Sequence, residues 1–385
     1  MNYRKTLIFL LLSLYLLPAC DSYAIPAFAR KYNMTCRTCH SPFPSLKPYG
    51  EDFAANGFVL ADQDAPRYFV NTGDEDLQLL RDLPIAIKLE AYATYNNGNK
   101  KQSDFTGPMI LKLLSGGNLA KHVSYYFYFI LERGEVTGLE DAFIMINDLL
   151  ISGLDFYIGQ FQVSDPLFKR ELRLTLDDYQ IYKARPGSSN VDLTYDRGVM
   201  LTYDLPTNTS LALEVINGNG IGGLKGDNFD NDKYKNFMGR VTQDIIDELR
   251  IGGFGYYGKE EQTSAVNELW MAGADGTISI DPLELNVQYV EREDKNPMFY
   301  IQSPEKVKTR GAFGELILRP NGDDSRWYSS ILYNWIESGQ SDLNMRMGTL
   351  HLGYLVKRNI RFIGEFSYNF ADKFGLFSTG FVTAF

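Results

Sequence analysis

The sequence predicts an all-β fold, a transmembrane antiparallel β-barrel of about 16 strands, with a small N-terminal segment that plugs or abuts the barrel. Apolar and polar residues alternate along most of the chain from residue 83 onward, which is the period of a strand with two different faces. Predicted connections alternate between short and long. Beyond the N-terminus no apolar run approaches the roughly 18 to 20 residues of a membrane helix, so a membrane crossing must use strands.

The composition supports this class. The chain combines 25 Tyr, 25 Phe and 34 Gly with 22% charged residues and a mean hydropathy of −0.23. These values exclude a helical membrane protein and a disordered chain. The net charge of −10 argues against a nucleic-acid partner, because binding phosphate requires a basic surface.

The first predicted strand shows the alternation clearly. Ile85, Ile87 and Leu89 share one face, whereas Lys88 and Glu90 point the other way. One face therefore suits lipid and the other water, although a soluble sandwich shows the same pattern. Strands are predicted at 84–95, 105–115, 122–134, 139–149, 154–164, 191–204, 208–218, 235–246, 248–259, 265–279, 283–294, 308–319, 325–338, 343–356, 359–371 and 375–385.

Connection lengths distinguish a barrel from a sandwich. Short connections are predicted at 151–153, 206–207, 281–282 and 357–358, and long ones at 165–190, 219–234 and 295–307. This asymmetry is typical of bacterial outer-membrane barrels, which have short periplasmic turns and long external loops. An even number of strands then places both ends of the barrel in the periplasm. The chain ends on Phe385, in phase with Phe377 and Phe381, as terminal strands of such barrels do.

The N-terminus has the pattern of an export signal. Arg4 and Lys5 precede an apolar run at 7–17, and Ala24 ends a small-x-small cleavage site. In an alternative interpretation, Cys20 is the acylated residue of a lipoprotein. The predicted organisation is a signal peptide at 1–24, a small N-terminal segment at 25–82 and a barrel at 83–385.

The most informative motif is Cys36-Arg37-Thr38-Cys39-His40. At this spacing two thiols bond to haem vinyl groups and the following histidine ligates iron, so the motif predicts one covalent haem c with His40 as proximal ligand. A redox motif would need a surrounding βαβ pattern, and a zinc site a second pair of ligands; neither pattern is present. A short helix is expected at 45–56, capped by Ser45 and stopped by Gly57.

Other candidate ligands are few. The sequence leaves the second axial ligand of the haem undecided. His351 and His122 are the histidine candidates, and each shares its strand phase with polar, lumen-facing neighbours. A Gly- and Asn-rich external loop carries Asp227, Asp230 and Asp232, whose oxygens suit a hard cation, although solvation is the usual role of such a loop.

The haem motif and four short stretches near it together resemble a known protein family. They are residues 25–32, 36–40, 43–46, 50–53 and 57–58. Together they resemble the N-terminal cytochrome of the fused monohaem cytochrome–porin family, whose best-known members are outer-membrane Fe(II) oxidases. The resemblance implies extracellular Fe(II) as electron donor and a soluble periplasmic cytochrome as acceptor.

Because a haem is smaller than the roughly 30 Å hydrocarbon layer, we expect the haem segment to enter the barrel and fill its pore. Two alternatives remain open. One is a substrate-conducting porin with a structural or regulatory haem, and the other is outward electron export to an extracellular acceptor.

Overall fold

A computed structural model describes residues 27–32, 34–58, 60, 69–70, 72–74, 76–77, 79–81, 83–98, 101–224 and 226–385. The predicted signal peptide and the alternative lipidation site at Cys20 lie outside these residues.

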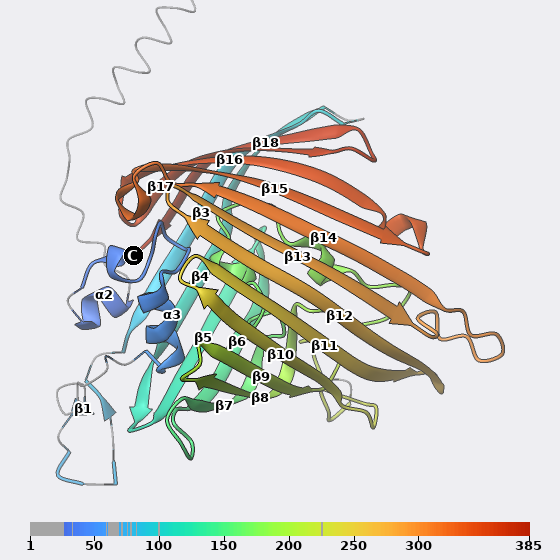
Figure 1. Ribbon diagram of the computed structural model, residues 1–385, viewed down its shortest axis with the longest axis horizontal. Coiled ribbons are helices and arrows are strands. Elements are labelled where there is room, and N and C mark those ends of the chain that lie inside the picture. The colour runs from blue at the N-terminus through green and yellow to red at the C-terminus, as the bar shows by residue number, and fades with distance from the viewer. Residues whose placement is uncertain are drawn as a thin grey trace, which may run out of the picture.

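Sixteen strands, β3 to β18, form one closed barrel in which every pairing is antiparallel (Figure 1). The barrel closes where β18 pairs with β3, from Leu376 opposite Asn96 to Ala384 opposite Lys88. The strands are β3 Ile85–Asn96, β4 Gln102–Ala120, β5 Val123–Glu132, β6 Glu135–Ile146, β7 Leu154–Gln162, β8 Tyr195–Leu205, β9 Thr209–Ile216, β10 Asn236–Ile246, β11 Leu249–Gln262, β12 Ala265–Ile280, β13 Leu283–Asp294, β14 Val307–Leu318, β15 Trp327–Ser338, β16 Met345–Lys357, β17 Ile360–Asn369 and β18 Phe374–Ala384. The predicted 16-strand antiparallel barrel is confirmed.

The remaining elements are short. They are the helices α2 Ala27–Tyr32 and α3 Pro48–Ala55, the 3₁₀ turns η1 Cys36–Thr38, η3 Arg170–Leu172, η4 Gln180–Lys183, η5 Gly322–Asp324 and η6 Ser341–Leu343, and a two-stranded sheet of β1 Phe69–Val70 and β2 Leu79–Leu80. Among the described residues, none of the helices has the length and apolar character needed to cross a membrane.

The two faces of the wall differ as the alternation predicts. On β13, Val287 and Tyr289 are exposed on the outside, whereas Gln288 and Arg292 are buried in the lumen. Polar groups therefore face inward and apolar groups face the surroundings, the arrangement of a barrel in lipid.

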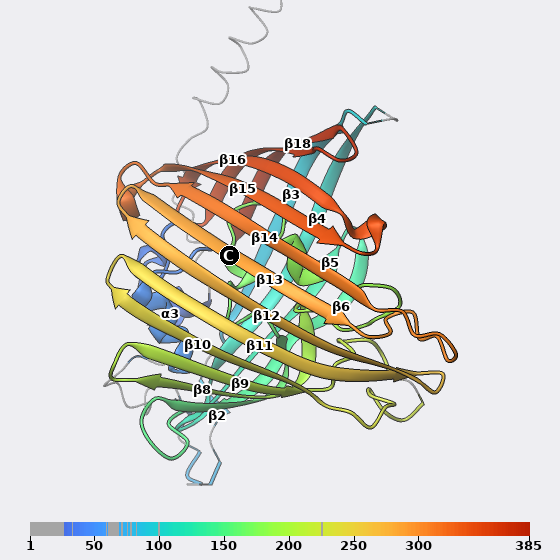
Figure 2. The ribbon, with the colours of Figure 1, turned by 45° about the vertical axis from the view of Figure 1, so that its right-hand side comes forward.

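The two ends of the barrel are also different. Connections at one end are mostly short, such as 247–248, 281–282 and 358–359. Those at the other end include the long segments 163–194 and 217–235. Helices α2 and α3 lie at the short-turn end (Figures 1 and 2), where the N–H of Phe385 also donates to the carbonyl of Ile87 at 2.8 Å. We call this end the periplasmic mouth.

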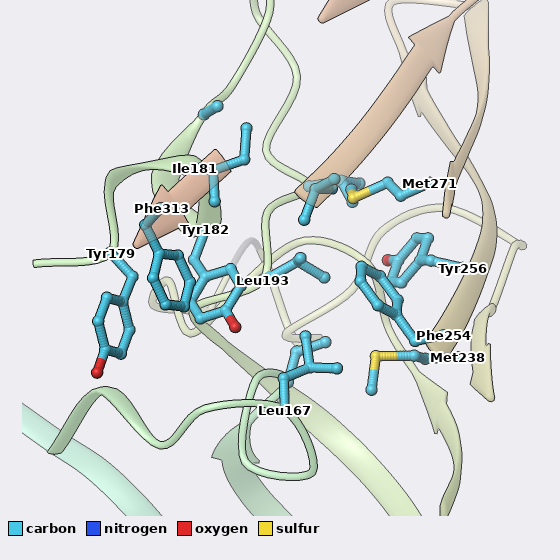
Figure 3. Close-up of a cluster of buried hydrophobic side chains, with 14 of the residues drawn as sticks. Leu167, Tyr179, Ile181, Tyr182, Leu193, Met238, Phe254, Tyr256, Met271 and Phe313 are labelled. Carbon is cyan, nitrogen blue, oxygen red and sulfur yellow. The ribbon is translucent and has the colours of Figure 1, made fainter. Parts of the chain in front are cut away.

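The interior of the barrel is filled by the loop at 163–194, which we call the lumen loop. Leu167, Tyr179 and Tyr182 of this loop pack against inward side chains of β10 to β15, and Figure 3 shows part of this cluster. Tyr179 stacks on Phe313 with 4.1 Å between ring centroids. The structure thus differs from the expectation that the haem segment fills the pore. The N-terminal segment lies at the periplasmic mouth. The lumen loop, whose apolar side chains need burial, occupies the middle of the barrel.

Helix α3 is shorter than predicted. It begins at Pro48 rather than near Ser45, because Lys47 before the proline is extended, with φ −91° and ψ 164°. Ser45 instead accepts a hydrogen bond from the backbone N–H of Ser41 at 3.0 Å. The helix ends where Gly57 takes a positive φ of 67°, as expected.

Candidate functional site

The predicted haem motif forms one compact turn. Cys36 begins η1, and its carbonyl accepts the backbone N–H of His40 at 2.9 Å. Helix α3 packs directly on the turn, because a Cβ at Gly50 would lie 2.4 Å from the carbonyl oxygen of Cys39. This close approach requires glycine at position 50. The two cysteines and the histidine are thereby presented by a single short segment.

His40 has the orientation of an iron ligand. Its Nδ1 lies 3.0 Å from the carbonyl oxygen of Pro44 and 3.3 Å from that of Ser45. Both contacts occupy Nδ1, which sets the tautomer and directs Nε2 away from the backbone. Burial lowers the pKa of His40 to about 4, and the nearby Arg361 cation acts in the same direction. The imidazole is therefore neutral at pH 7, the form that binds iron.

The two thiols are poorly suited to other chemistry. Cys36 and Cys39 are both free, and burial raises the pKa of each. Thiol–disulfide enzymes and thiolate metal sites lower a thiol pKa instead. Within the described ranges, no group of three or more His, Cys, Asp or Glu side chains could hold a metal ion. The arrangement therefore disfavours the redox and zinc alternatives, and it is compatible with thioether bonds to haem.

Aromatic rings join the segment to the barrel wall. Phe28 of α2 stacks on Phe58 at 4.8 Å between centroids, and Phe58 in turn stacks on Tyr126 of β5 at 5.3 Å. Phe53 of α3 is buried at the edge of both Phe28 and Phe58. This small core depends on a barrel residue, so the segment and the wall share it.

Polar contacts to the segment come mainly from two connections of the periplasmic mouth that are longer than their neighbours. The side chain of Asn147 donates to the carbonyl of Ala55 at 2.9 Å, and Arg319 NH1 donates to the carbonyl of Ser41 at 2.9 Å. In the second connection, Asp323 pairs with Lys47, and Asp324 pairs with Arg37 of the haem motif. These two connections, 147–153 and 319–326, hold the segment at the mouth.

The two other histidines occupy different positions. His122 lies in the turn after β4 with φ 58°, nearly half exposed, and its Nδ1 is 3.6 Å from Asp148. His351 on β16 is 0% exposed inside the barrel. Its Nδ1 lies 2.8 Å from Glu365, while its Nε2 has no hydrogen-bond partner among the described residues.

The surroundings of His351 resemble those of ligating histidines, which bond a carboxylate through the other ring nitrogen. Tyr328 stacks on the His351 ring at 5.7 Å between centroids and accepts a hydrogen bond from Arg361 at 2.7 Å. Arg361 in turn lies over Phe43, next to His40. The two histidines are therefore connected through Tyr328 and Arg361. Ligation of iron by His351 or His122 stays a prediction.

The acidic external loop is engaged with its own neighbours. Asp230 pairs with Lys235 at 2.5 Å, and Asp232 accepts the backbone N–H groups of Tyr234 and Glu261. Asp227 is exposed. Binding of a cation by these three aspartates stays a prediction, and the contacts described here show solvated and locally bonded carboxylates.

Sequence reasoning missed the residues of the wall that receive the segment. Arg319, Arg361 and Asn147 are single polar residues at or near turns, and nothing in the alternation separates them from other lumen residues. The one available signal was the greater length of connection 319–326 in a series of short turns.

No protein-family model and no curated protein matches this sequence. Solved structures do match. An anion-selective porin from Comamonas acidovorans has 10% identity and a TM-score of 0.58, over 79% of this chain and 99% of that chain. OmpT, an outer membrane protein of Vibrio cholerae, has 12% identity and a TM-score of 0.54, over 80% and 99%. The outer membrane channel DcaP of Acinetobacter baumannii has 11% identity and a TM-score of 0.56, over 79% and 97%.

These likenesses show the fold. The chain is a β-barrel of the bacterial outer-membrane porin type, as the sequence predicts. At 10 to 12% identity, the porin likeness carries no information on the haem motif.

Proposed function

We propose that this protein is an outer-membrane electron-transfer protein that carries one haem c on Cys36 and Cys39, with His40 as the proximal iron ligand. The observation that carries this proposal is the geometry of His40: its ring is held through Nδ1 by the carbonyls of Pro44 and Ser45, which leaves Nε2 for iron. Haem c, when bound, takes up and releases one electron. The residues of the motif hold it at the periplasmic mouth, within reach of a soluble periplasmic cytochrome.

The filled lumen argues against free passage of solutes. The lumen loop is fixed across the barrel, because the backbone N–H groups of Leu176 and Asp177 donate to Glu365 at 2.7 and 3.0 Å. Four strands away in the barrel order, on β13, Arg292 Nη1 donates to the carbonyls of Ala184 and Val191, and Lys112 on β4 pairs with Glu171 of the loop. Contacts to these separate strands hold the loop inside the lumen, which narrows any aqueous path.

Fe(II) is the electron donor that we propose, on the resemblance of residues 25–60 to the cytochrome–porin family. In that reaction an extracellular Fe(II) ion would lose one electron and become Fe(III), and a soluble periplasmic cytochrome would accept one electron; a haem held by Cys36, Cys39 and His40 would supply the redox centre between them. The net charge of −10 is compatible with a cationic donor. Asp227, Asp230 and Asp232 are the external carboxylates that we propose to meet it first.

The second candidate is a substrate-conducting porin in which the haem is structural or regulatory. The likeness to solved porins and channels favours it. The same architecture also allows outward electron export to an extracellular acceptor.

One set of measurements on purified protein separates these functions. We expect a haem-stained band on a denaturing gel, reduction of the haem within a stopped-flow record after Fe(II) is added, and reoxidation by a periplasmic cytochrome. In planar bilayers the conductance should be far below that of an open porin. Haem-containing protein that is not reduced by Fe(II) but shows high conductance is a substrate-conducting porin. A haem whose midpoint potential is too negative to accept an electron from Fe(II), in protein of low conductance, indicates outward electron export.

A further inference from the structure

Five arginines are buried in the described part of the chain: Arg170, Arg240, Arg292, Arg319 and Arg361. Four of them pair with a carboxylate. The partners are Asp178 for Arg170, Asp275 for Arg240, Asp294 for Arg292 and Glu284 for Arg319. These pairings follow from the high free energy of a buried charge that lacks a counter-charge.

Arg361 is the exception. Its side chain, on β17 near the periplasmic mouth, is 4% exposed, and no carboxylate of the described residues pairs with it. NH1 donates to the hydroxyl of Tyr328 at 2.7 Å, and Nε has no hydrogen-bond partner among the described residues. A buried guanidinium with a free N–H and no counter-ion indicates that an anion from outside the polypeptide completes the site.

The position of Arg361 indicates which anion. Its guanidinium carbon lies 5.7 Å from the centroid of the Phe43 ring, and that ring lies 5.0 Å from the ring of His40. A haem held by His40 carries two propionate carboxylates, and carboxylate is the group that a guanidinium binds best through paired N–H groups.

We propose that Arg361 is a cofactor-positioning residue that binds a propionate of the haem through Nε and the adjacent amino group. This inference rests on the proposed function, since it requires haem on Cys36 and Cys39. It adds a function for the barrel wall: strand β17 fixes the orientation of the haem and supplies a buried positive charge beside it. Such a charge stabilises the reduced haem, because reduction adds one negative charge.

The test is a redox titration of the purified holoprotein carrying Arg361→Gln. At the midpoint potential of the wild type, we expect the ratio of reduced to oxidised haem to fall about tenfold, equivalent to about 59 mV for one electron. Arg361→Lys keeps the charge, and its ratio should stay within about threefold of the wild type. In resonance Raman spectra, the propionate bending band should move in both variants, because both lack the Nε donor.

Two matched controls separate this role from the general loss of a buried or nearby cation. The double variant Arg240→Gln with Asp275→Asn removes a buried arginine and its carboxylate partner on β10 and β12, without changing the net charge. Arg358→Gln removes a cation that acts on Cys36 but is only partly buried. Both controls should retain the wild-type Raman band and a reduced-to-oxidised ratio within about threefold.

An Arg361→Gln ratio within threefold of the wild type, or an unmoved propionate band, overturns the inference. Should the glutamine variant fail to assemble, as judged by heat-modifiable gel mobility, the band of the lysine variant alone decides the matter. Wild-type protein without covalent haem would instead refute the proposed function, so the two failures are distinguishable.

Discussion

The barrel and the N-terminal segment are stabilised in different ways. Each barrel strand is held by continuous backbone ladders to two neighbours, for example twelve residue pairs between β13 and β14. The described part of the segment contains helices of six and eight residues and depends on single contacts to the wall, such as those of Asn147 and Arg319. In a closed barrel of this kind every strand is paired along both edges, so the backbone groups are satisfied within the wall. The segment is completed by groups outside its own sequence, and its chemistry therefore depends on how it docks.

The sharpest test of this difference removes the haem attachment. The double variant Cys36→Ser with Cys39→Ser should lose all covalent haem on a denaturing gel, because no thiol remains in the motif for a thioether bond. The barrel should persist, with β-rich circular dichroism and heat-modifiable mobility. Wild-type protein that is colourless where haem c maturation is active would contradict the interpretation of the motif.

A second test asks whether the wall completes the iron site. We expect His351→Ala to convert a six-coordinate low-spin spectrum to a high-spin one, since the Nε2 of His351 is buried without a partner. His122→Ala, at a half-exposed turn position, is the control and should leave the spectrum unchanged. If both variants keep the wild-type spectrum, neither histidine binds iron.

A third test concerns the lumen loop. Like the N-terminal segment, this loop is held by side-chain contacts rather than by backbone ladders. Asp178 is buried and forms ion pairs with Arg170, Arg173 and Lys183. The cations of Arg173 and Arg170 in particular hold the pKa of its carboxyl well below the usual range. Asp178→Ala should destabilise the loop by about 3 to 5 kcal/mol, as for other broken buried ion pairs.

Planar-bilayer recordings measure the consequence of that change. We expect single-channel conductance to rise when the loop is released from the lumen. Asp227→Ala makes the same charge change at an exposed loop position and serves as the control. An unchanged conductance in Asp178→Ala would show that the loop does not limit the pore.

The smallest expected effect is the pH dependence of docking. The Lys47 cation lowers the pKa of Asp323. A carboxyl whose folded pKa is depressed contributes stability above its unfolded pKa, about 3.9, and loses it as pH falls through the folded value. Proteolysis of the segment should therefore accelerate below about pH 4 in the wild type, and Asp323→Asn should remove that part of the pH dependence.

Much of this protein could be predicted because its signals are local. Alternation with a period of two along β3 and β17 places each side chain on one of two faces, so strand positions follow within a few residues. The Cys36–His40 motif is equally local, since Cys36, Cys39 and His40 lie within one turn, and its attachment to haem stays a prediction. Strand number, lumen polarity and the periplasmic position of both ends of the barrel follow from the same pattern.

Only the tertiary structure decided which residues, distant in the sequence, come into contact inside the barrel. Arg319 donates a hydrogen bond to the carbonyl of Ser41, which lies 278 residues earlier in the sequence. Glu365 accepts the backbone N–H of Leu176 in the lumen loop, 189 residues earlier. Arg361 lies beside Phe43, although nothing in the alternation distinguishes it from other inward residues of β17. Alternation fixes the face on which a residue lies. Closure and tilt of the whole barrel decide which distant residue it faces, because both depend on all sixteen strands together.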